Sequence, residues 1–236
     1  RGAVLGSALA NVLTATGHNV TREYYVNDAG SQMDTFYESL YVRYAQKLGR
    51  SNEELPENGY RGKYLEEIGA ELSSEFGNRF LDLPRDQGVR EIGEIGLNRM
   101  LESIETNLLQ LGVAFDVWFR ERQLFEEKQY DVVMKLLNDN GFVTQREGAT
   151  WFTSTALGSE KDNVLVRGTG QPTYFASDAA YHYDKFSVRK FDRVINIWGA
   201  DHQGHVDRLH AVVDALGLDS KKLTIIISQL VTLKRG

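Results

Sequence analysis

One segment near the carboxyl end of the chain constrains the fold more than any other. Residues 194–198 form an apolar run typical of a buried parallel strand, and an amphipathic helix follows as far as Leu216. Between them, Gly199-Ala200-Asp201-His202 places a carboxylate, an imidazole and free backbone N–H groups where the strand ends. Open α/β sheets bind ligands at this edge, and a ribose hydroxyl or a phosphate suits these groups. The alternative is a helix N-cap made by Asp201, with histidines on the surface.

The order of strand and helix patterns along the chain predicts the fold class. Residues 18–26, 193–198 and 223–233 have strand patterns, and helices are expected over about 1–17, 31–48 and 202–216. Strands that alternate with helices favour a parallel sheet. We therefore predict an α/β fold with a Rossmann-like, doubly wound parallel sheet, in which the three strands are neighbours or near neighbours.

A block of helices interrupts this alternation. Helices are expected over about 63–76 and 87–111, and they indicate a mainly helical insertion over 46–115. The α/β domain would then consist of a first part, 1–45, and a second part, 116–236. In the second part we expect strands at 116–119 and 164–167, helices at 130–140 and 177–186, a hairpin over 142–155 that turns at Gly148, and a short extended segment at 172–175.

Composition excludes several classes of protein. Of the 236 residues, 42% are hydrophobic and 25% are charged, which is typical of globular domains, and no apolar run is long enough to cross a membrane. The net charge of −6 argues against a surface that binds nucleic acid as a whole, although a local basic patch is still possible. The absence of cysteine excludes disulfides and thiolate chemistry, and a cytoplasmic protein with no membrane partner fits best.

Five segments carry the patterns of one known family in that family's order: residues 1–11, 22–32, 116–122, 161–182 and 199–205. Together they resemble class I aminoacyl-tRNA synthetases, and among them the arginyl-tRNA synthetase family. The first segment is similar to the helix after the family's His-x-Gly-His signature, and the last matches the Gly-x-Asp-His element that faces the adenosine ribose. The segment 161–182 resembles the part that carries the amino-acid pocket.

The resemblance implies a function and a set of partners. The α/β domain would be a nucleotide-binding catalytic domain that activates L-arginine with ATP and transfers it to tRNA. Mg²⁺ would accompany ATP, although the sequence shows no dedicated set of ligands for it. The family contacts tRNA mostly through domains that this chain does not contain, and we expect the full-length enzyme to be a monomer. The alternative is a non-catalytic, synthetase-like module that binds a nucleotide or an amino acid.

Two signatures of the family are absent from the chain. Neither His-x-Gly-His, with the strand before it, nor a loop of the Lys-Met-Ser-Lys-Ser type occurs between Arg1 and Gly236. Both signatures stabilise charge on the ATP phosphates in the transition state. We therefore expect a chain truncated at both ends, with no catalytic residues of its own and no activity in isolation. The absent strand would be a central one, so its absence would leave unpaired backbone groups.

The resemblance places Tyr174 and Asp178 on the arginine side chain. A carboxylate can accept two parallel hydrogen bonds from a planar guanidinium, which agrees with this role for Asp178. We expect Ser177 to cap a helix and Asp178 to lie in its first turn, where the helix dipole favours the ionised form. Asn27, Asp28 and Gln32 are the other arginine-binding candidates; for these three, a turn with an N-capping Asp is an equal alternative.

The ATP-binding candidates come from two segments: Gly199, Asp201, His202, His205, Gln229, Leu230 and Val231. The resemblance gives the ribose to Asp201 and His202, and the adenine ring to backbone groups of 229–231. Zinc binding by His202 and His205 is disfavoured because the third histidine, His210, would lie on another face of the helix. His182, one turn after Asp178, is predicted either to orient that carboxylate or simply to face solvent.

Overall fold

The chain divides into two units, which the computed structural model describes over residues 1–232. The α/β unit combines Arg1–Asn27 with the chain from Phe115 onward, and the helical unit is Asp28–Ala114. The helices and strands of the α/β unit are α1 (Gly2–Ala15), β1 (Glu23–Val26), β2 (Val117–Arg120), α5 (Gln123–Glu126), α6 (Gln129–Asp139), β3 (Val143–Arg146), β4 (Ala149–Phe152), β5 (Asn163–Val166), α7 (Tyr174–Tyr183), β6 (Val194–Gly199), α8 (Val206–Ala215) and β7 (Leu223–Ser228).

Parallel pairing is confirmed in both strand pairs that carry the candidate site. β6 pairs with β7 over six residues, from Val194 opposite Leu223 to Gly199 opposite Ser228. β1 pairs with β2, beginning with Glu23 opposite Val117. Each pair is joined by a crossover that contains helices, as parallel strands require.

We predicted one parallel sheet in which 18–26, 193–198 and 223–233 are neighbours or near neighbours, and in residues 1–232 direct pairing is found only between the last two. Within the described residues, β1 is bonded only to β2, and β6 only to β7. The strand expected over 18–26 begins only at Glu23, because 18–22 follow the turn at Gly17, and Arg22 is the first residue to bond across to Asp116. The strand expected over 223–233 ends at Ser228, and residue 233 lies outside the described part of the chain.

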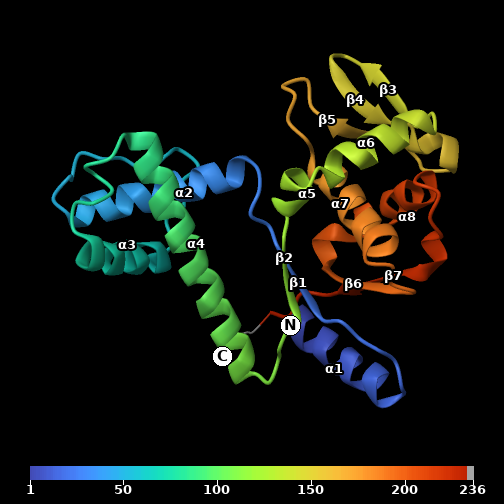
Figure 1. Cartoon of the computed structure of the whole chain (residues 1–236), viewed down its shortest axis with the longest axis horizontal. Coiled ribbons are helices and arrows are strands. Elements are labelled where there is room, and N and C mark those ends of the chain that lie inside the picture. The colour runs from blue at the N-terminus through green and yellow to red at the C-terminus, as the bar shows by residue number, and fades with distance from the viewer. Residues whose placement is uncertain (233–236) are drawn as a thin grey trace. The chain divides into compact units, whose positions relative to one another are not determined.

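One hydrophobic core joins the two strand pairs. Its buried centre comes from α7, α8 and the strands around them, including Ala179, Leu209 and Val212. Side chains of both pairs, among them Tyr25 and Ile225, pack against it. In Figure 1, α7 and α8 lie on one side of β6 and β7, and α1 lies on the other, where it contacts β6. The helices thus cover both faces of the β6–β7 pair, as in a doubly wound fold.

A small antiparallel sheet of β3, β4 and β5 forms the edge of the α/β unit. The predicted hairpin is confirmed, since Val143 pairs with Phe152 and the turn contains Gly148 at φ +74°. Phe152 and Leu165 point from this sheet into the core. The extended segment expected at 172–175 is limited to a single bridge between Val166 and Pro172, because Thr173 already caps α7.

The helical unit consists of α2 (Ser31–Lys47), α3 (Lys63–Phe76) and α4 (Arg85–Gln110) around a core of its own. α4 approaches α2 so closely that a Cβ on Gly96 would lie 2.0 Å from Cδ2 of Leu40. The unit begins at Asp28 rather than at the expected residue 46, because α2 buries Leu40 and Tyr44 against α3 and α4. Within the described residues, no helix has both the length and the apolarity needed to cross a membrane.

Candidate functional site

Tyr174 and Asp178 lie on one face of α7, one helical turn apart. Tyr174 is exposed, at 53% of the residue's surface, whereas Asp178 is half-buried. An exposed phenol ring and a half-buried carboxylate, one turn apart, are groups that suit a long cationic side chain.

Asp178 is not in the first turn, contrary to our expectation. Thr173 is the N-cap of α7, so Ser177 caps nothing and Asp178 is the fifth residue of the helix. Burial raises the pKa of Asp178 to about 7, an effect that the charge of Glu121 reinforces and the cations Arg208 and Lys185 oppose. A carboxylate with this pKa gains strongly from a bound cation.

Two residues near Asp178 were missed as site candidates. Glu121 is buried directly after β2, and Tyr25 lies on the neighbouring strand β1. The pKa of Tyr25 is raised by burial and by the charges of Glu121 and Asp178, which places the three side chains together. Their position in the sequence could have identified them. They lie at or near the carboxyl ends of two strands, and the carboxyl ends of parallel strands meet at one edge of a sheet.

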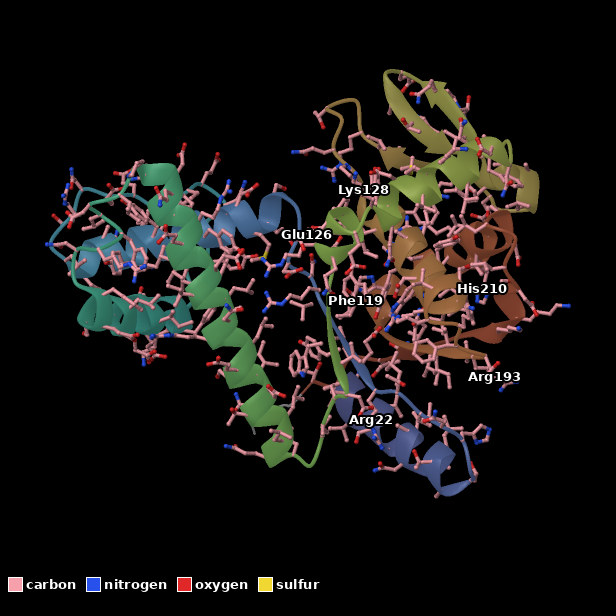
Figure 2. The ribbon with its side chains drawn as sticks, viewed as in Figure 1. Arg22, Phe119, Glu126, Lys128, Arg193 and His210 are labelled. Atoms are coloured by element: carbon pink, nitrogen blue, oxygen red, sulfur yellow. The ribbon has the colours of Figure 1, made fainter. Side chains whose placement is uncertain are left out.

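His182 is buried, with 1% of its surface exposed, so the solvent-facing alternative is wrong. Its Nδ1 lies 2.7 Å from the carbonyl oxygen of Asp178. Around it α7 packs tightly: Phe119 of β2, labelled in Figure 2, and Tyr181 have ring centroids 4.6 Å apart. The helix that carries Asp178 is therefore held from several sides.

Three of the seven ATP-binding candidates line a cleft of about 330 Å³ at the carboxyl ends of β6 and β7. Its lining residues are Arg1, Gly2, Ile197, Trp198, Gly199, Ser228, Leu230 and Val231. The three are Gly199, Leu230 and Val231, whereas Asp201, His202, His205 and Gln229 do not line the cleft. Leu230 is 87% exposed, so this wall of the cleft is open to solvent.

Asp201, His202 and His205 share a 3₁₀ turn, Ala200–His205, between β6 and α8. α8 begins at Val206 rather than at the expected residue 202, and Asp201 caps no helix in the described structure, contrary to the alternative that we considered. Nε2 of His202 lies 3.4 Å from Oδ2 of Asp201, and the rings of His202 and His205 are 5.4 Å apart. Gly199 makes room for this turn, because a Cβ there would lie 2.4 Å from Oδ1 of Asp201.

Asn27, Asp28 and Gln32 follow β1. Asn27 ends the first segment of the α/β unit, whereas Asp28 and Gln32 belong to the helical unit. Gly30 is the N-cap of α2, with φ +79°, so Asp28 does not cap that helix. A role for these three residues in binding arginine remains a prediction.

Within residues 1–232, no three His, Cys, Asp or Glu side chains are grouped closely enough to hold a metal ion.

Comparisons with known proteins agree with this geometry. Residues 1–231 match the family described as tRNA synthetases class I (R), catalytic domain. The chain is 52% identical over 236 residues to an arginine–tRNA ligase of Dehalococcoides mccartyi and 47% identical to one of Carboxydothermus hydrogenoformans. It matches along its whole length but spans only 42% of either relative.

Solved structures show the same fold. A structure described as an arginyl-tRNA synthetase from Campylobacter jejuni matches 97% of this chain, and 49% of its own, with a TM-score of 0.87 and 33% identity. The arginyl-tRNA synthetase of Thermus thermophilus, 17% identical with a TM-score of 0.69, supports the fold alone. The predicted Rossmann-like α/β class is confirmed, and the chain belongs to the catalytic-domain family of the class I tRNA synthetases for arginine.

Proposed function

We propose that the complete gene product carrying this chain is an arginine–tRNA ligase, which joins L-arginine to tRNA at the expense of ATP. The observation that carries the proposal is the pair Tyr174 and Asp178 on α7, in a chain whose residues 1–231 match the family. The half-buried carboxylate selects a cation, and the exposed ring next to it gives access to a long side chain. The activity of the relatives, of which this chain spans 42%, supports the same conclusion.

In the first step, the arginine guanidinium donates two parallel hydrogen bonds to Asp178. Glu121 adds negative charge to the same site, and the bound cation lowers the pKa of Asp178 from about 7, because it stabilises the ionised form. Arg208 and Lys185 limit that charge, so the free carboxylate is not left uncompensated. This pairing fixes the position of the amino acid, with its own carboxylate free to react.

ATP would bind in the cleft at the ends of β6 and β7, with its ribose at Asp201 and His202. A carboxylate oxygen of arginine attacks the α-phosphorus, the bond to pyrophosphate breaks, and arginyl-adenylate forms. A ribose hydroxyl of tRNA then attacks the arginyl carbonyl carbon and releases AMP. Neither step needs a covalent enzyme intermediate, so the protein contributes position and electrostatic stabilisation.

The test is ATP–pyrophosphate exchange by the complete gene product in the presence of tRNA. We expect exchange that depends on arginine and is absent with lysine, whose single ammonium cannot make the paired bonds of a guanidinium. Failure of arginine to support exchange would refute the proposal; arginine binding without exchange would instead indicate the non-catalytic module. Sedimentation of the same protein tests the expected monomer.

A further inference from the structure

A buried chain of polar side chains crosses the core of the α/β unit and ends on the backbone of Asp178. Nζ of Lys185 donates to Oδ1 of Asn196 at 3.3 Å, and Nδ2 of Asn196 donates to Nε2 of His182 at 2.8 Å. Nδ1 of His182 then donates to the carbonyl oxygen of Asp178 at 2.7 Å. The three side chains come from α7, β6 and the π-helical turn Asp184–Val188 that follows α7.

The chemistry of each group fixes the direction of this chain. A lysine ammonium can only donate, so the oxygen of Asn196 must face it and the amide nitrogen must face His182. Nε2 of His182 therefore accepts, and its single proton stays on Nδ1, where it is donated to Asp178. Burial keeps the imidazole neutral by lowering the pKa of His182 to about 3. Every link is satisfied in one tautomer only.

This series of buried hydrogen bonds lies where unpaired polar groups would cost stability. His182, Asn196 and Lys185 are all buried, and buried polar groups destabilise a core unless each one is paired. The π-helical turn directs Lys185 inward, where Nζ lies 3.7 Å from the centre of the Tyr181 ring. π turns inside helices are often found at functional sites. Here the turn supplies the cation that begins the chain.

The other end of the π-helical turn is tied to β1. Nε of Arg189 lies 2.6 Å from Oδ2 of Asp184, and both Arg189 and the hydroxyl of Tyr181 bond to Glu23. The helix that bears Asp178 is therefore anchored to β1 by an ionic cluster and to β6 by the polar chain. Of these two anchors, only the series Lys185–Asn196–His182 includes a bond to Asp178, at its carbonyl oxygen.

We propose that His182 and Asn196 are positioning residues for the arginine site, which hold the turn of α7 that presents the Asp178 carboxylate. This inference rests on the proposed function. A guanidinium makes two parallel bonds only if the carboxylate plane is correctly aimed, and catalytic constellations tolerate displacements of only about 0.5 Å. The bond from His182 to the Asp178 carbonyl holds the backbone from which that carboxylate extends, and Asn196 fixes the tautomer that makes the bond.

The test is Asn196→Leu in the complete gene product, which keeps the size of the side chain and removes both of its hydrogen bonds. We expect KM for arginine to rise about tenfold, the effect of about one lost hydrogen bond, while KM for ATP and kcat stay within about twofold. The matched control is Asn163→Leu. Asn163 is as buried as Asn196, at 9% against 8%, but its amide bonds to Ser154 and Lys161 rather than toward α7.

An equal rise of KM for arginine in both variants, or no rise in Asn196→Leu, would overturn the proposal while leaving the proposed function intact. A wild-type protein without arginine-dependent exchange would overturn both. If Asn196→Leu does not fold, ¹⁵N NMR of wild-type protein labelled at histidine decides. We expect His182 to be neutral at pH 7 with its proton on Nδ1, and a proton on Nε2 would refute the chain as described.

Discussion

The two candidate binding regions of the α/β unit are held in opposite ways. Asp178 lies half-buried on a helix that is anchored to β1 and β6, and its charge is perturbed by three other ionisable residues. Asp201 lies on a 3₁₀ turn with 80% of its side chain exposed, and its ionic contact is with His202, itself half-exposed. In the region around Asp178, burial raises the pKa of the carboxyl group, and neighbouring charges adjust it. The other region is a surface turn whose shape comes from the backbone.

This difference predicts how sensitive each region is to mutation. Charge pairs gain strength when water is excluded, so a change at Asp178 should have a large effect on one substrate. An exposed carboxylate contributes less, because water competes for its hydrogen bonds. We therefore expect the two sites to separate cleanly in steady-state exchange kinetics, with arginine and ATP varied in turn.

The largest effect is expected for Asp178→Asn in the complete gene product. The amide keeps the shape but presents a donor to a guanidinium that can only donate, so one bond is replaced by repulsion. Removing one partner of a buried charged pair costs ~2–5 kcal/mol, so KM for arginine should rise ~30-fold or more. KM for ATP should change less than about twofold. Equal damage to both substrates would contradict a specificity role.

Asp184→Asn is the matched control for that variant. It removes a buried carboxylate six residues further along, whose partner is Arg189 rather than the arginine substrate. We expect a lower melting temperature, but a KM for arginine within about threefold of the wild-type value. A loss at Asp184 as large as that at Asp178 would mean that stability, not recognition, governs both results.

The next effect concerns pH. Arginine binds the ionised form of Asp178, and the empty site, with its pKa of about 7, holds a proton below that pH. KM for arginine should therefore fall about tenfold between pH 6 and pH 8, since the ionised fraction rises from about a tenth to about nine-tenths. Asp178→Asn should remove this slope. A KM that is flat from pH 6 to pH 8 in the wild type would show that the empty carboxylate is already ionised.

A smaller effect is expected at the other site, from Asp201→Ala. Loss of a charged hydrogen bond to the ribose should raise KM for ATP about fivefold, less than for a buried pair because the side chain is exposed. KM for arginine should stay within about twofold. A rise in KM for arginine without one for ATP would move Asp201 out of the nucleotide site.

The sequence predicted the regular elements better than their ends and pairing. Its helix over 63–76 coincides with α3, because one apolar face packs on α2 and the turns on either side are marked by glycine. It began α7 three residues late, because Tyr174 and Phe175 were assigned to the extended segment that starts at Pro172. It extended β7 past Ser228, because Leu230 and Val231 are apolar but exposed.

The same limit applies to the site. Tyr174 and Asp178 were predicted from the resemblance to the family, and the structure places them one turn apart on a single helix. Glu121 and Tyr25 lie close to Asp178 only through packing of separate elements, and the chain Lys185–Asn196–His182 connects a π-helical turn to a strand. Contacts of this kind leave no periodicity in a sequence. Burial determines which of these polar side chains have shifted pKa values. Burial follows from how the whole core packs, so the sequence pattern does not reveal it.

The smallest effect, and the sharpest test of the surface turn, is Gly199→Ala. The backbone of Gly199 has φ −69°, which any residue can adopt, so the methyl group should not strain the fold. It would, however, lie 2.4 Å from Oδ1 of Asp201, and the exposed carboxylate must turn away. We expect an unchanged melting temperature and a KM for ATP about threefold higher, within the range of one weakened hydrogen bond.

Gly204→Ala, in the same turn but with no atom within 4 Å of its new Cβ, is the control that should leave KM for ATP unchanged. If both variants bind ATP as the wild type does, the position of Asp201 does not matter to the nucleotide. The surface turn Ala200–His205 would then not be a binding region whose function depends on its backbone shape.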